Sequence, residues 1–191
     1  MAKKISTGWY VLGGIAILAF ILIIWFVSAY NSLITLSESV DTSWAQVENQ
    51  FQRRADLIPN LVSTVKGYAE HEKSLFTEIT ELRSQWANAG SRGEKIQVAQ
   101  GMESALSRLL VVAENYPQLK ANENFLSLQT QLEGTENRVA VERGRYNDAV
   151  RAYNIKIQRI PTNIVANMFG YEKEEYFEAD EGAQTVPSVQ F

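Results

Sequence analysis

The sequence predicts an all-α protein: a single transmembrane helix followed by an elongated antiparallel bundle of long, coiled-coil-like helices. Three observations support this prediction. The first two are an uncharged apolar run near the N-terminus and apolar residues that recur every three or four positions over most of the remaining chain. A third is that no stretch alternates apolar and polar residues as a strand does. We expect a short N-terminal tail over residues 1–8, a transmembrane helix over 9–30, a helical bundle over 31–171 and an acidic, flexible tail over 172–191.

The transmembrane helix is predicted from the apolar run between Trp9 and Val27. At ~1.5 Å per residue these residues reach about 28 Å, close to the ~30 Å hydrocarbon core of a bilayer. Aromatic side chains favour the headgroup level, and they stand at both ends of the run: Trp9, Tyr10, Trp25, Phe26 and Tyr30. The alternative is a cleaved signal peptide, but the run exceeds the usual apolar region of ~7–15 residues, so we favour the anchor.

The orientation of the anchor is predicted from the basic residues around it. Lys3 and Lys4 precede the apolar run, whereas no Lys or Arg follows it until Arg53. The positive-inside rule then places the N-terminus in the cytoplasm and the soluble domain on the extracytoplasmic side.

The soluble domain begins with an apolar stripe that has helical spacing: Leu33, Leu36, Val40, Trp44, Val47 and Phe51. No Gly or Pro lies between Ala16 and Ile58, which allows the anchor to continue into this helix. Pro59 lacks an amide N–H and restricts Ile58, so we expect a kink or tight break over residues 56–60. The stripe resumes at Leu61 and continues to Trp86, and residues 88–93 are predicted to form a loop.

Two further long helices are predicted. The third covers about residues 94–115 and ends at Tyr116-Pro117. The fourth shows apolar or aromatic residues seven apart from Phe125 to Ile160, a coiled-coil pattern over about 36 residues that stops at Pro161. A short fifth helix is expected over residues 162–169.

Composition excludes several classes of function. The net charge of −4 argues against nucleic-acid binding, and the absence of cysteine excludes thiol chemistry and zinc–thiolate sites. His71-Glu72 opens like a zinc-protease motif, but Leu75 stands where the second histidine is required. We therefore expect no catalytic residue, cofactor, metal or small-molecule substrate, and interpret the glutamates around His71 as a solvated face: Glu70, Glu72, Glu78 and Glu81.

Two groups of polar residues are candidates for structural or interaction roles. In Arg53-Arg54-Ala55-Asp56-Leu57-Ile58-Pro59-Asn60 the spacing of Arg53 and Asp56 suits a local ion pair; binding of Arg53 or Arg54 to a lipid phosphate or a partner carboxylate is the less favoured alternative. The dipeptides Tyr146-Asn147 and Tyr153-Asn154 are seven residues apart. We expect their asparagines to hydrogen-bond to another helix, of this chain or of a neighbour, and to fix its register.

These segments resemble the signatures of the LemA family of bacterial membrane proteins. The likeness runs from about Tyr30 to Glu178, through the Arg53–Asn60 segment, both Tyr-Asn dipeptides and Ile160-Pro161. Ile160 departs mildly, because the family usually has an aromatic residue before that proline. The resemblance implies one span and a helical bundle in the bacterial inner membrane, without an established enzyme activity, and links with membrane proteases and membrane-remodelling systems. The family's topology has also been drawn with the domain in the cytoplasm.

Three functions follow as hypotheses. The first is a structural scaffold of the bacterial envelope that forms a homo-oligomer through its helical seams, with the lipid bilayer as a further partner. The second is an adaptor for a membrane protease or another envelope protein. The third is an enzyme, which the lack of a nucleophile motif and of a histidine pair disfavours.

Overall fold

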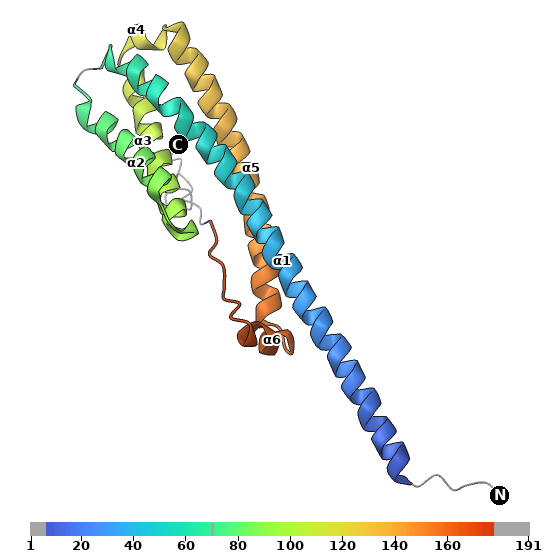
Figure 1. Cartoon of the computed structure of the whole chain (residues 1–191). Helices are drawn as coiled ribbons and strands as arrows, with labels where there is room; N and C mark the ends of the chain where they lie inside the picture. Colours follow the sequence, from blue (N-terminus) through green and yellow to red (C-terminus); the bar gives the residue numbers. More distant parts are fainter. Residues whose placement is uncertain (1–6, 70, 178–191) are drawn as a thin grey trace, which may run out of the picture. The chain divides into compact units, whose positions relative to one another are not determined.

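The computed structural model describes residues 7–69 and 71–177 (Figure 1). Within these residues the chain forms six α-helices and no strand, which confirms the predicted all-α class. The helices are α1 (Thr7–Lys66), α2 (Lys73–Asn88), α3 (Arg92–Glu114), α4 (Pro117–Lys120), α5 (Glu123–Gln158) and α6 (Thr162–Met168). The described residues divide into two compact units.

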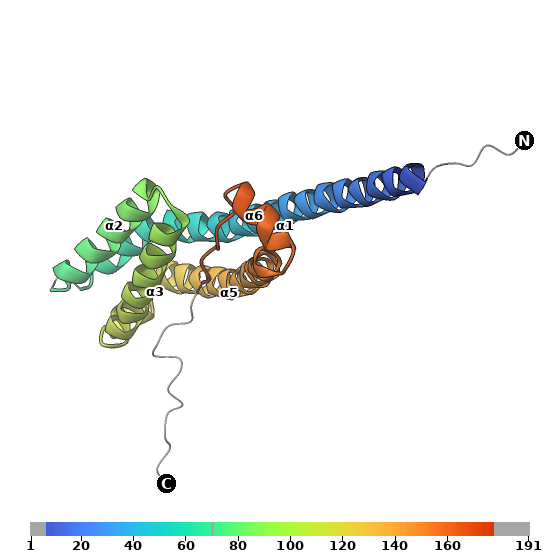
Figure 2. The same ribbon diagram turned by 90° about the horizontal axis from the view of Figure 1, so that it is seen from below.

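The first unit combines residues 7–41 with residues 149–174. Large apolar side chains from Trp9 to Ile24 are 53% to 71% exposed, and α1 is long and apolar enough to cross a membrane, as predicted. Further along α1, Leu33 and Val40 are buried. Figure 2 shows α6 next to the C-terminal end of α5, and Gly170, with a φ of 71°, ends α6 in the left-handed conformation that glycine favours.

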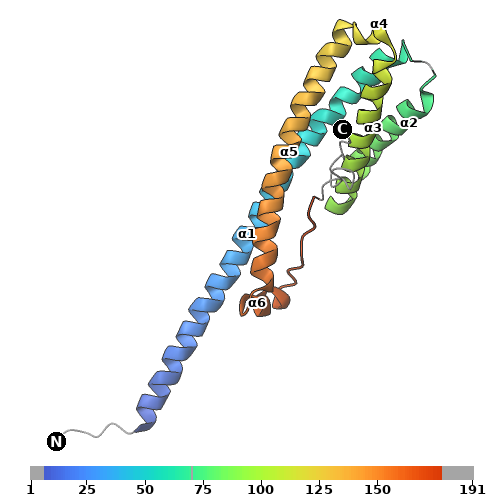
Figure 3. The same cartoon turned by 180° about the vertical axis from the view of Figure 1, so that it is seen from behind.

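The second unit combines residues 42–148 with residues 175–177. In it α2 and α3 form an antiparallel pair, and α4 joins α3 to α5 (Figure 3). The loop before α3 is capped in both directions: the Ser91 hydroxyl accepts the amide of Glu94, and the Glu94 carboxylate accepts the amide of Gly90. A Cβ at Gly101 of α3 would stand 3.0 Å from Leu82 of α2, so glycine permits the close approach of the two helices.

From Phe125 to Tyr153 the predicted seven-residue pattern is a pattern of burial within the chain, whereas its last member, Ile160, lies beyond α5 and is 85% exposed. In the second unit, Phe125, Leu132, Val139 and Tyr146 are all at most 4% exposed. In the first unit the same holds for Tyr153 at 3%, with Ile157 at 7%. The predicted third and short fifth helices are confirmed as α3 and α6. The four-residue helix α4 was not predicted, because its proline was interpreted as the end of a helix rather than the start of one.

A kink or a tight break was expected over residues 56–60, and the break is wrong. Helix α1 continues through Pro59 to Lys66, and the chain turns only at Gly67 and Tyr68. Proline has no N–H to donate to the carbonyl four residues earlier, that of Ala55. In the structure Nε of Arg83, from α2, donates to this carbonyl at 3.2 Å. A side chain far away in the sequence thus replaces the missing backbone donor.

Residues 172–177 are not part of a flexible tail, contrary to the prediction. Residues 172–177 were assigned to it because of their acidic side chains, yet their backbone groups are hydrogen-bonded to α5, and Phe177 is 4% exposed. The remainder of the predicted tail, residues 178–191, lies outside the described residues, as does most of the predicted N-terminal tail with Lys3 and Lys4.

Candidate functional site

A cluster of four charged side chains lies between the helices of the second unit. Arg54 comes from α1, Glu103 from α3, and Glu136 and Arg143 from α5. The Arg54 guanidinium is 2.7 Å from a carboxylate oxygen of Glu136 and 3.4 Å from one of Glu103. Arg143 approaches the same Glu103 oxygen to 2.6 Å. One carboxylate is therefore held between two guanidinium groups, which links three helices.

The electrostatics of the cluster are set by burial. The side chains of Arg54 and Glu103 are only 6% and 13% exposed. Removal from water raises the pKa of Glu103 above its ordinary value of 4.5, and the charge of Glu136 adds to this rise. The hydrogen bond and positive charge of Arg143, together with the charge of Arg54, act in the opposite direction. The burial penalty thus outweighs the attraction of the two guanidinium groups.

Arg143 also joins the charge cluster to the aromatic core. Its guanidinium lies 5.3 Å from the ring centre of Phe51 and 4.6 Å from that of Phe177. Phe177 stacks on Phe51 and on Trp44, with ring centres 6.0 Å and 6.2 Å apart. Stacking of a weakly hydrated guanidinium on aromatic faces stabilises a buried arginine. The segment that carries Phe177 is accordingly part of the core.

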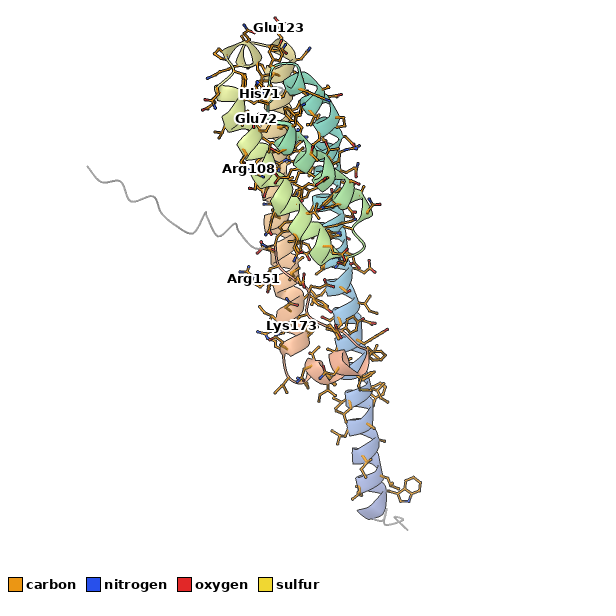
Figure 4. All side chains as sticks on the ribbon, turned by 90° about the vertical axis from the view of Figure 1, so that its left-hand side faces the viewer. His71, Glu72, Arg108, Glu123, Arg151 and Lys173 are labelled. Carbon is orange, nitrogen blue, oxygen red and sulfur yellow. The ribbon has the colours of Figure 1, made fainter. Side chains whose placement is uncertain are left out.

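An open groove of about 930 Å³ borders the cluster. Its walls come from α2, α3 and α5, and Figure 4 shows Glu72 and Arg108 on adjacent stretches of this surface. The groove is lined by a mixture of charged, small polar and apolar side chains: Glu72, Ser74, Leu75, Glu78, Glu103, Ser104, Ser107, Arg108, Val111, Val112, Glu136 and Arg143. The chain's one histidine, His71, does not line the groove, and no group of residues suited to hold a metal ion occurs among the described residues.

The dipeptide Tyr146-Asn147 binds the backbone of residues 175 and 177 in the second unit. The Tyr146 hydroxyl donates to the carbonyl of Glu175 at 2.9 Å. The Asn147 side chain both accepts the amide of Phe177 and donates to its carbonyl, each at 2.8 Å. A side-chain amide that pairs with both backbone groups of one residue imitates a strand neighbour.

The dipeptide Tyr153-Asn154 repeats this arrangement in the first unit. The Tyr153 hydroxyl donates to the carbonyl of Glu172 at 2.9 Å, and Asn154 pairs with the amide and carbonyl of Glu174 at 3.0 Å and 2.9 Å. Burial raises the pKa of Tyr153, and the charge of Glu174 adds to it. The prediction that these asparagines hydrogen-bond to another helix is wrong, because each pairs with the backbone of a residue after α6. The segment they fix is extended chain rather than a helix, because only extended chain leaves its N–H and C=O groups open to a side-chain amide.

The other residues predicted to have structural or interaction roles make local contacts or are exposed. Arg53 is exposed, and Asp56 accepts a hydrogen bond from Gln52 at 3.0 Å rather than pairing with Arg53 in the described structure. The carbonyl of Asn60 accepts the hydroxyls of Ser63 and Thr64. In the first unit, Pro161 follows a cis peptide bond and directly precedes α6.

The predicted membrane-interface aromatics divide into two groups. Trp9 and Tyr10 are 71% and 68% exposed. Phe26 and Tyr30 contact Phe169, with ring centres 6.2 Å and 4.5 Å apart, and Trp25 is half-buried. The far end of the apolar run is therefore partly covered by the residue that follows α6.

Several residues of these sites were missed by sequence reasoning. Glu103, Glu136 and Arg143 were not singled out, since none of them belongs to a motif and charged residues on helices usually face solvent. Arg83 was missed for the same reason, although an unsatisfied carbonyl near Pro59 signalled that some donor was needed. Phe177 offered the clearest signal, an aromatic residue within an acidic stretch.

Comparison with known proteins places the chain in a family. The LemA family profile matches residues 43–191. The chain is 29% identical over 182 residues to the magnetosome proteins MamQ 1 and MamQ 2 of Paramagnetospirillum magneticum, which covers 82% of this chain and 67% of each relative. It is 25% identical over 157 residues to protein LemA of Metamycoplasma hominis, with 82% of this chain and 72% of that protein covered. On the strength of the profile match, this chain is a member of the LemA family.

Proposed function

We propose that this protein is a membrane-anchored, non-catalytic scaffold that self-assembles in the bacterial inner membrane. The observation that carries the proposal is α1, in which one uninterrupted helix contains both the exposed apolar run and the residues that pack in the helical bundle. The name of the family and the names of its relatives denote no reaction. A helical protein with its apolar run in a bilayer is suited to a structural role.

The chemistry of the buried polar residues supports a structural role. Arg54, Glu103 and Arg143 bind one another across three helices, and the two Tyr-Asn dipeptides bind backbone groups. Each of these side chains makes a contact that stabilises the fold. A catalytic acid or base would instead need access to a substrate.

The surface for self-assembly must differ from the one that the sequence suggested. The seam residues of α5 pack within the chain, with Val139 and Tyr146 0% exposed. They are therefore not available to a neighbouring copy. An exposed apolar side chain outside the seam is a better candidate, such as Val111 of α3, which is 63% exposed.

Light scattering of the full chain in lipid nanodiscs or a mild detergent tests the proposal. A scaffold should give a discrete protein mass that is a multiple of 21.5 kDa. The variant Val111→Glu should lower this mass, whereas Lys120→Glu, an exposed charge reversal, serves as the control. A wild-type protein that remains monomeric at high concentration would contradict self-assembly.

A second function, an adaptor for a membrane protease or another envelope protein, is favoured by the groove. Four glutamates and two arginines line it, and Arg54 pairs with one of these glutamates, so a small excess of negative charge remains that suits a partner segment with a basic side chain. A photo-crosslinking residue at position 107, inside the groove, should capture one dominant partner, while the same residue at position 141, outside it, should not. Equal capture at both positions would count against a specific adaptor surface.

We also propose that the soluble helices lie on the extracytoplasmic side, because the basic residues of the N-terminus precede the span. The chain has no cysteine, so Val141→Cys introduces a single thiol. A maleimide that cannot cross membranes should label this thiol in intact spheroplasts. Labelling only after lysis would reverse the orientation.

A further inference from the structure

The segment from Ile160 to Tyr171 is free of charged residues in a chain of which 21% is charged. It contains α6, which is small and two-sided. Thr162, Val165 and Ala166 are buried against the first unit. The opposite side presents apolar side chains to the surroundings: Ile160 at 85%, Ile164 at 58%, Met168 at 66% and Phe169 at 49% exposure. An exposed apolar face with this spacing requires an explanation.

The position of this face within the first unit supplies one. The Phe169 ring lies 4.5 Å from Tyr30 and 6.2 Å from Phe26, measured between ring centres. These two residues stand at the end of the apolar run of α1, where aromatic rings favour the headgroup level of a bilayer. Figure 2 shows α6 beside α1 and the end of α5. The apolar face is therefore continuous with the membrane-facing part of α1.

Basic side chains lie next to the apolar face. Lys156 and Arg159, at the C-terminal end of α5, line a shallow hollow of about 430 Å³ together with Ser32 and Thr35 of α1. Hydroxyl groups and cations are the donors that phosphate oxygens accept. Long basic side chains can extend along an apolar surface while their charges reach the headgroups.

We infer that α6 and the turn before it form a second membrane contact, which places Ile164 and Met168 among the lipid headgroups and upper acyl chains, with Lys156 and Arg159 at the phosphates. This inference rests on the proposed membrane anchor. Amphipathic helices bind bilayers in this way when an apolar face is flanked by basic residues. The anchor already holds α6 at the surface, so a small apolar area suffices.

A second copy of the chain is the main competing occupant of this face. Specific protein interfaces bury about 800 Å² per partner. The four exposed side chains, two on the seven-residue helix α6 and two flanking it, provide only part of such an area. Lipid requires no shape complementarity, and it is present wherever α1 crosses the bilayer.

Spin labels on single cysteines distinguish these occupants in the full chain, which has no native cysteine. The protein is reconstituted in vesicles of phosphatidylglycerol and phosphatidylethanolamine, with one label at position 18, 164 or 141. Leu18 lies in the apolar run, Ile164 in α6, and Val141 is an apolar residue of α5 with an exposure of 53%, close to the 58% of Ile164. Collisions with oxygen, which enters lipid, are compared with collisions with a nickel chelate, which stays in water.

We expect oxygen to dominate at positions 18 and 164 and the nickel chelate at position 141. Dominance of nickel at 164 with oxygen at 18 would overturn the second contact while leaving the anchor intact. Low access of both reagents at 164 would mean that protein covers α6, which also overturns the inference. Dominance of nickel at 18 would refute the anchor itself. A label at position 168 repeats the measurement if the substitution at 164 disturbs α6.

Discussion

The hydrogen bond from Arg83 to the carbonyl of Ala55 predicts an energetic coupling to Pro59. Pro59 cannot donate to this carbonyl, and Arg83 does so at 3.2 Å. Ala55 is 2% exposed, so its carbonyl has little access to water. Replacing Arg83 by Met keeps the length of the side chain but removes the donor, and it leaves a buried carbonyl without a partner.

The size of the effect follows from the cost of an unsatisfied buried acceptor. Such a group costs about 1–3 kcal/mol, and because Arg83 is itself exposed we expect Arg83→Met to lower the unfolding free energy by about 1.5 kcal/mol. In the Pro59→Ala background the new amide of residue 59 donates to Ala55, so the same substitution should cost less than about 0.5 kcal/mol. The difference, about 1 kcal/mol, is the coupling energy of the pair.

Urea unfolding of the full chain in detergent, followed by circular dichroism, measures the four proteins of this cycle. Arg138→Met, at an exposed position of α5, controls for the general effect of replacing arginine. An equal cost of Arg83→Met in both backgrounds would refute the reasoning. It would mean that the Ala55 carbonyl finds another donor or that the Arg83 contact contributes nothing.

Three further predictions concern the second unit. Asn147→Leu should destabilise the fold by about 2 kcal/mol and speed hydrogen exchange at the Phe177 amide, whereas Asn137→Leu, at an exposed site on the same helix, should do neither. Unchanged exchange would contradict the pairing of Asn147 with the backbone of Phe177. Arg54→Met should cost about 3 kcal/mol in thermal or urea unfolding, because it leaves the buried Glu103 with one cation instead of two; a neutral result would show that the cluster relaxes. Because the folded pKa of Glu103 is raised, its contribution to stability is fully present below the unfolded pKa and is lost as pH rises through the folded pKa. The stability of wild type relative to Glu103→Gln should therefore increase as pH falls toward 4.5, and unfolding titrations that show a decrease would reverse the assigned direction.

Much of the fold could be predicted from the sequence because a helix can be recognised from the spacing of apolar residues that are close together in the chain. The apolar run of α1, the seven-residue pattern of α5 and the loop before α3 each depend on residues close together in the chain. The break at Pro59 was a local inference as well, and it was wrong because the deciding donor, Arg83, is supplied by another helix. Tertiary contacts override a local preference when they satisfy the group that the preference leaves unsatisfied.

The candidate site was less accessible to sequence reasoning, for a related reason. Arg54 was noticed beside the proline, but its partners Glu103 and Glu136 follow it by 49 and 82 residues, and nothing local distinguishes them from solvated glutamates. The Tyr-Asn dipeptides were recognised from their spacing alone, yet the spacing could not show what they bind. Their repetition nevertheless carried information. Tyr146 and Tyr153 hold the carbonyls of residues 175 and 172, and Asn147 and Asn154 hold residues 177 and 174, so a step of seven along α5 accompanies a step of three along the terminal segment. Side chains that recur every seven residues along α5 thus bind backbone groups of the extended segment after α6. This explains why that acidic segment is part of the fold as far as Phe177, despite a composition that is typical of a solvated tail.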